Sequence, residues 1–198
     1  AGATLAMETN FPEGETATLK LTLKAAKQFT LALRRPSWAG DGFTVKINGN
    51  AIKQLSAPGT YIELKRKWKS GDAVALTLPK TLRLEPLPDN SRVTAIMWGP
   101  LALAADLGPE SERRRGRTGG QSISIPSFVT AESSLSAWIK AATDKPGVFR
   151  TDSIGRVNHS APEQSVELMP FYRLHRRTYS VYFDLFTPAE WEKKAAAL

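Results

Sequence analysis

Few residues of this 198-residue chain could carry out chemistry, and they are scattered. There are two histidines, His159 and His175, and no cysteine. Zinc sites need three or four His, Cys or carboxylate ligands at characteristic spacings, and no such set accompanies either histidine. No serine lies in the Gly-x-Ser-x-Gly turn that exposes a hydrolase nucleophile. The sequence therefore predicts no metal site, no cofactor and no nucleophilic centre.

Carboxylates are the remaining catalytic candidates. Glycosidases use a pair of them about 5 to 10 Å apart in the folded enzyme. Glu63, Asp72, Asp89 and Asp106 are available, but none stands in a distinguishing sequence context. An independent enzyme is therefore the weakest of three interpretations, after an accessory region and a sugar-binding module.

The formal charge of +8 favours anionic partners in general. Part of it lies in Arg113-Arg114-Arg115 and Arg117, beside several glycines. Aromatic residues that could stack on bases are missing next to this run, so we interpret residues 109–124 as an exposed basic linker and expect no nucleic acid partner.

No apolar run approaches the roughly 20 residues that a membrane-spanning helix needs, so we expect no membrane partner. The lack of cysteine leaves both a cytoplasmic and an exported bacterial protein open.

Short β-strands are the elements that must position all these residues. From Thr16 to Leu23, leucines alternate with threonine and lysine, which is typical of a half-buried strand. Asn48-Gly49 between two apolar runs indicates a tight hairpin. Val93–Trp98 and Leu101–Leu107 are almost continuously apolar and should be the most buried strands. Such short strands between turn signals predict an all-β fold, an antiparallel, jelly-roll-like β-sandwich.

We expect the sandwich to occupy residues 1–108 and to be followed, after the linker, by a β-rich segment over residues 125–198. This segment is either an extension of the sandwich or a second small unit, and it should contain one or two short helices. One helix is predicted from Ser133 to Ala142. The other follows Thr187, where Pro188 and Glu190 complete a capping box.

Two groups of aromatic residues are candidates for contact surfaces. Trp38, in the proline-stiffened segment that begins at Arg35, and Trp98 are candidates for an interface with a neighbouring domain. Phe171, Tyr172 and Tyr182 crowd a short span and are candidates for self-association.

Five motifs resemble, in order, the sandwich of glycoside hydrolase family 127, which includes bacterial β-L-arabinofuranosidases. They are Leu33-Arg34-Arg35-Pro36-Ser37-Trp38-Ala39, Val45-Lys46-Ile47-Asn48-Gly49, Trp68-Lys69-Ser70-Gly71-Asp72, Leu84-Glu85-Pro86-Leu87-Pro88-Asp89-Asn90 and Met97-Trp98-Gly99-Pro100-Leu101. A weaker similarity extends through residues 170–175 and 178–183. One departure is Arg35, which stands where the family commonly has an apolar residue.

The resemblance implies a catalytic (α/α)6 barrel with a zinc-bound cysteine nucleophile and a glutamate acid/base, and no residue here matches those positions. The chain opens at Ala1 rather than Met, and we expect the barrel to precede it in a longer protein. By itself the chain is expected not to be an enzyme. It should be an accessory region that packs against and stabilises the barrel and forms a homodimer. The alternative is a module that binds plant-wall carbohydrate such as arabinofuranosides.

Overall fold

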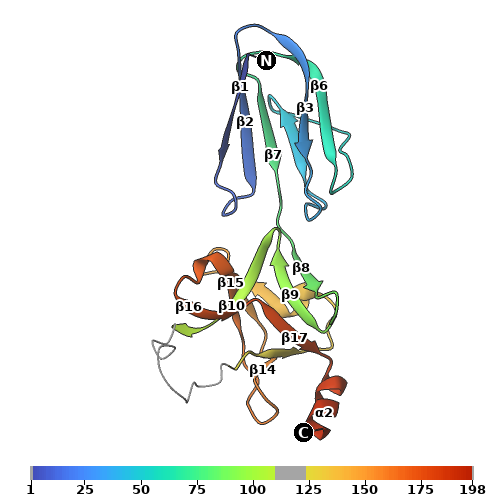
Figure 1. Cartoon of the computed structure of the whole chain (residues 1–198), viewed down its shortest axis with the longest axis vertical. Coiled ribbons are helices and arrows are strands. Elements are labelled where there is room, and N and C mark those ends of the chain that lie inside the picture. The colour runs from blue at the N-terminus through green and yellow to red at the C-terminus, as the bar shows by residue number, and fades with distance from the viewer. Residues whose placement is uncertain (1, 110–123, 198) are drawn as a thin grey trace. The chain divides into compact units, whose positions relative to one another are not determined.

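The structure is a computed structural model that describes residues 2–109 and 124–197 (Figure 1). The chain divides into two compact units, Ala1–Thr81 and Leu82–Leu198.

The first unit is an antiparallel β-sandwich. One sheet has the order β1-β2-β7-β4-β5, and the other pairs β3 with β6. The strands are β1 (Ala3–Thr9), β2 (Thr16–Leu23), β3 (Lys27–Arg34), β4 (Thr44–Ile47), β5 (Asn50–Ala51), β6 (Tyr61–Trp68) and β7 (Ala73–Thr77).

The core of the first unit follows from strand alternation. Leu19, Leu21 and Leu23 point from β2 toward the core, while the threonines and lysine between them point outward. Trp68 is fully buried, and its indole N–H donates to the carbonyl of Phe29 at 3.1 Å, so the ring is buried without leaving its donor unpaired. The resulting core cluster joins β3 and β6 to β2, β4 and β7.

The hairpin between β4 and β5 has the geometry that its sequence predicts. Asn48 and Gly49 both have positive φ, 50° and 84°. A two-residue type I′ turn needs positive φ at both central positions, which asparagine and glycine adopt at low cost. The Asn48 Oδ1 also accepts a hydrogen bond from the amide N–H of Ala73 at 2.8 Å, and this bond links the turn to β7.

The second unit is built on one large sheet with the order β12-β13-β15-β10-β9-β17-β11-β14, on which β8 pairs with β9 and β16 with β10. One of its pairs, β11 with β17, is parallel. Its core cluster contains Phe128, Trp138 and Phe183, whose rings are in contact. The elements are β8 (Leu82–Pro86), β9 (Val93–Trp98), β10 (Leu101–Pro109), β11 (Ser127–Val129), α1 (Leu135–Trp138), β12 (Ile139–Ala141), β13 (Phe149–Thr151), β14 (Gly155–Arg156), β15 (Glu167–Pro170), the 3-10 turn η2 (Phe171–Arg173), β16 (Arg177–Ser180), β17 (Tyr182–Phe186) and α2 (Pro188–Ala196).

The all-β, antiparallel sandwich fold with short helices is confirmed, whereas jelly-roll connectivity stays a prediction. The predicted boundary at residue 108 is wrong, because β9 pairs with β17 and β10 pairs with β15 and β16. These pairings join residues 82–109 to the C-terminal strands, so the first unit ends at Thr81. The expected basic linker, residues 109–124, lies outside the described residues except for its first and last positions.

The two predicted helices have different outcomes. The helix expected over Ser133–Ala142 is only the single turn α1, because Ile139–Ala141 instead pair as β12 with β13. The C-terminal helix is present, and the Thr187–Glu190 capping box forms in both directions. None of the helices in the described ranges is both long and apolar enough to cross a bilayer.

Candidate functional site

The two histidines lie in different surroundings. His159 stacks on Trp191 with ring centroids 4.2 Å apart, and its Nε2 lies 2.9 Å from the Trp191 carbonyl oxygen, whereas His175 is exposed. Within residues 2–109 and 124–197, no three His, Asp or Glu side chains are placed to hold a metal ion.

Two of the candidate carboxyls, Asp72 and Asp106, have lowered pKa values. Asp72 accepts hydrogen bonds from Asn48 Nδ2 at 2.8 Å and from the Lys69 amide at 2.9 Å, and these bonds lower its pKa. Burial opposes ionisation of Asp106, but hydrogen bonds from Arg177 and the Gly108 amide outweigh it and lower the pKa of this carboxyl too. A glycosidase general acid needs the opposite, a raised pKa. These two carboxylates therefore do not suit the general-acid role, and in this structure they accept hydrogen bonds from neighbouring parts of the chain.

Arg35 fastens the loop that carries Trp38. Its guanidinium donates to three backbone carbonyls, those of Ala39 at 3.1 Å, Ser56 at 2.8 Å and Gly40 at 2.9 Å. It also lies 5.3 Å from the centroid of the Phe43 ring. A charged side chain is stable here because each bond replaces one that the group would make to water. Arg35 thus holds the loop in one shape, and direct contact of Arg35 with another domain stays a prediction.

Trp38 is half-buried beside a second loop, residues 11–14, which Lys80 holds in place. Its ring stacks on that of Phe11, with centroids 6.0 Å apart and planes 17° from parallel. The ammonium of the buried Lys80 donates to the carbonyls of Pro12, Glu13 and Gly14 and lies 5.9 Å from the Phe11 centroid. The Phe11–Trp38 pair is therefore held from both sides on a rigid support, as a contact surface requires.

β1 carries an apolar strip that the sequence reasoning missed. Leu5 and Met7 are 48% and 66% exposed, and all seven residues of β1 are exposed. They lie opposite Leu21 and Leu19 in the β1–β2 register, and directly opposed residues share one face of a sheet. Leu5 and Met7 therefore face the core side, but β1 contributes nothing to the core cluster. The alternation of apolar residues in β1 was the available signal, weakened by Ala6 among the outward positions.

In the second unit Trp98 is also half-buried. Its ring meets Phe149 edge-on, with centroids 5.2 Å apart, and packs against the core cluster. Gly147 lies beside it with φ +72°, and a Cβ there would come within 3.4 Å of the Trp98 ring and 3.2 Å of the Arg173 guanidinium. The assignment of Trp98 to a domain interface stays a prediction.

The residues expected to mediate self-association are exposed. Phe171, Tyr172 and Tyr182 are 45%, 41% and 47% exposed. The first two are neighbours on η2, and Tyr182 begins β17. Phe183, which belongs to the same aromatic-rich span, is 1% exposed and is part of the core instead.

The two β units match two different family models. Residues 1–80 match the middle domain of the GH127 β-L-arabinofuranosidase family, and residues 83–185 match a family described as a domain of unknown function. The change from one model to the other coincides with the division between the units at Thr81 and Leu82. No protein with a curated function matches the chain in sequence.

Solved structures share this fold. A glycoside hydrolase aligns with a TM-score of 0.62 at 19% identity, over 93% of this chain and 32% of its own. A GH127 beta-L-arabinofuranosidase from Geobacillus stearothermophilus aligns with a TM-score of 0.60 at 20% identity, over 92% of this chain and 30% of its own. A GH127 beta-arabinofuranosidase aligns with a TM-score of 0.58 at 20% identity, over 93% and 33%. The chain spans about a third of the length of these proteins.

Both units thus share their fold with a part of these longer proteins. The chain belongs to the family described as a domain of unknown function, whose model covers residues 83–185, and its first unit matches the GH127 middle domain over residues 1–80. This confirms the resemblance carried by the five sequence motifs.

Proposed function

We propose that this chain is a non-catalytic accessory region that packs against the (α/α)6 catalytic barrel of a longer GH127 protein and stabilises it. The two matched domains, about a third of the length of the similar glycoside hydrolases, support a role as one part of such a protein.

The uncovered apolar strip of β1 carries the proposal. Leu5 and Met7 lie on the core side of their sheet, yet they remain 48% and 66% exposed. Burying one such side chain fully contributes about 1.5 to 3 kcal/mol, so a partner that covers both gains a substantial driving force. The fastened Phe11–Trp38 pair offers a second rigid contact in the same unit.

A binding experiment with a matched control tests this proposal. The chain is titrated into the separately expressed barrel of its parent protein and followed by calorimetry. We expect Leu5→Lys/Met7→Lys to weaken binding at least tenfold, since the exposed positions tolerate lysine but the covered interface does not. The control Thr4→Lys/Ala6→Lys adds the same charge to the opposite face of β1 and should bind as the unmodified chain does.

Two results would overturn the assignment. One is equal weakening by the two double variants, which would place the contact away from the apolar strip. The other is hydrolysis of a nitrophenyl β-L-arabinofuranoside by the purified chain alone.

Dimerisation through the exposed aromatics of the second unit is a further part of the proposal. Phe171 and Tyr172 are adjacent and exposed, as side chains at the centre of an interface between two copies would be in the monomer. Sedimentation should detect a dimer that Phe171→Ser/Tyr172→Ser dissociates. A monomer at all concentrations would contradict it.

A second candidate function is carbohydrate binding, and Tyr61 favours it. Its side chain is 55% exposed on β6, and the guanidinium of Arg34 lies 5.8 Å from its ring centroid. An exposed aromatic ring beside a polar donor is the combination with which sandwich proteins hold sugar rings.

A further inference from the structure

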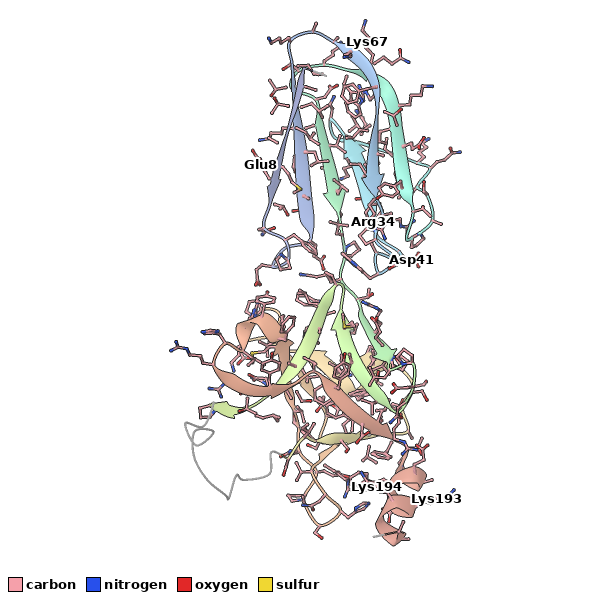
Figure 2. The ribbon with its side chains drawn as sticks, viewed as in Figure 1. Glu8, Arg34, Asp41, Lys67, Lys193 and Lys194 are labelled. Atoms are coloured by element: carbon pink, nitrogen blue, oxygen red, sulfur yellow. The ribbon has the colours of Figure 1, made fainter. Side chains whose placement is uncertain are left out.

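The outward face of the β3–β6 sheet carries a group of positively charged side chains. The two strands pair along their full length, from Lys27 opposite Trp68 to Arg34 opposite Tyr61. Leucine and isoleucine residues alternate toward the core, so the residues between them form the outward face. These outward residues are Gln28, Thr30, Ala32 and Arg34 on β3 and Tyr61, Glu63, Lys65 and Lys67 on β6. Figure 2 shows Arg34 and Lys67 at opposite ends of the sheet.

Positive charge on this face exceeds negative charge. Residues 1–81 contain twelve Lys and Arg but only six Asp and Glu. Arg34, Lys65 and Lys67 form no ion pair with any part of the chain that the structure describes, and Glu63 is the one acid among the outward residues of the two strands. Two of the other acids are engaged elsewhere, Glu8 with Lys20 at 2.8 Å and Asp72 with Asn48. Three cations without an ion-pair partner, against one acid on the same face, leave a net positive charge that attracts an anion.

The spacing of these residues favours a long ligand over a compact one. Alternate residues on a strand lie about 7 Å apart, so Tyr61 and Lys67 are about 20 Å apart along β6. A compact anion could meet only one of these positions at a time. An extended polymer with a negative charge on each unit could meet the cations in succession while one of its rings lies on Tyr61.

We propose that this basic face, made of Arg34, Tyr61, Lys65 and Lys67, binds an acidic polysaccharide built of uronic acid units. The inference rests on the second candidate function, sugar binding at Tyr61, and names its ligand class. Single-stranded nucleic acid is disfavoured because it is held by successive aromatic platforms, and the face has one aromatic residue. A membrane surface is disfavoured because the face carries no large aliphatic side chain to insert.

The test uses polygalacturonate as the acidic probe, with neutral arabinan and single-stranded DNA beside it. Binding of the whole chain is measured by calorimetry at low and at physiological salt. We expect saturable binding of polygalacturonate that weakens as salt rises. Lys65→Glu/Lys67→Glu should weaken it at least tenfold, Tyr61→Ala at least threefold, and Tyr61→Phe less than twofold.

Lys46→Glu/Lys53→Glu is the matched control. It makes the same change in net charge, but Lys46 lies exposed on β4 of the other sheet and Lys53 lies exposed just after β5. Its affinity should stay within twofold of the unmodified chain.

Each other outcome overturns the inference in a recognisable way. Binding of arabinan but not of polygalacturonate would keep carbohydrate binding and refute the acidic ligand. Absence of binding to either polysaccharide would refute carbohydrate binding and the acidic ligand together. Equal weakening by the two charge reversals would reduce the effect to net charge, and tighter binding of DNA would assign the face to nucleic acid.

Discussion

Asp72 should be the most sensitive polar position of the first unit. It is 7% exposed in the turn between β6 and β7, where it accepts hydrogen bonds from Asn48 Nδ2 at 2.8 Å and from the Lys69 amide at 2.9 Å. Arg66 lies 4.0 Å away. The carboxylate therefore joins the β4–β5 hairpin to the β6–β7 turn.

Asp72→Ala removes both acceptors at once. Each hydrogen bond to a charged group contributes about 1.5 to 3 kcal/mol, and the two donors can recover part of this by binding water. We expect a loss of about 2 to 4 kcal/mol in the stability of the first unit. Asp72→Asn keeps one acceptor oxygen and should lose about half as much.

Hydrogen exchange localises the effect, because the chain contains two units whose unfolding need not be coupled. Amides of β4, β6 and β7 should exchange faster in Asp72→Ala by a factor that corresponds to this loss, whereas amides of β9 and β17 should be unchanged. A change below about 0.5 kcal/mol would refute the reasoning, since that is the scale of an ordinary surface substitution.

The pH dependence has a defined sign. The hydrogen bonds from Asn48 and Lys69 lower the pKa of Asp72 below its usual 3.8. A depressed native pKa contributes stability that is present above the unfolded value and is lost as pH falls through the native value. The stability difference between the unmodified chain and Asp72→Asn should therefore be constant above about pH 5 and shrink below pH 4.

Two further predictions concern the loops and the C-terminal helix. Arg35→Met should destabilise the first unit by about 2 to 4 kcal/mol, because three carbonyls lose their donor. Arg35→Lys should recover only part of this stability. Equal melting temperatures of the unmodified chain and the two variants would contradict the prediction. Thr187→Ala should cost α2 about 1 kcal/mol by removing the cap on the Glu190 amide, measured as faster exchange of α2 amides, with Thr178→Ala outside the helix as the control.

Sequence patterns predicted the elements whose signals are local. The alternation in β2, the Asn48-Gly49 hairpin and the Thr187 cap each depend on residues a few positions apart, so they can be read without knowledge of the rest of the fold. The helix predicted from Ser133 failed because the pairing of β12 with β13, which no local pattern encodes, outweighs the helical preference of Ile139–Ala141.

Long-range pairing also explains the misplaced boundary. β8, β9 and β10 have the same apolar character as the strands before them, so composition alone assigned them to the first sandwich. Their partners β15, β16 and β17 begin more than 50 residues later in the chain. The change of composition near residue 108 was real, but it falls within the second unit and not at the border between units.

The surface features also could not be predicted from the sequence alone, because they depend on which strands and loops come together in the fold. Trp38 and Arg35 were identified as a pair from the sequence, but only the structure assigns Arg35 to fastening the loop and stacks Trp38 on Phe11. The apolar strip of β1 was missed because a strand that covers no core has the same alternation as one that does. The basic face was missed because its cations come from two strands and align only through the β3–β6 register.

The two proposed surfaces of the first unit lie on different sheets, and this makes them experimentally independent. Leu5 and Met7 lie on the core side of the sheet that contains β1, whereas Lys65 and Lys67 lie on the outward side of β6. One molecule can therefore use both at once. Lys65→Glu/Lys67→Glu should leave barrel binding unchanged, and Leu5→Lys/Met7→Lys should leave polysaccharide binding unchanged. Loss of both activities in either variant would indicate a single shared surface or an unfolded unit, which the exchange of β4 and β7 amides distinguishes.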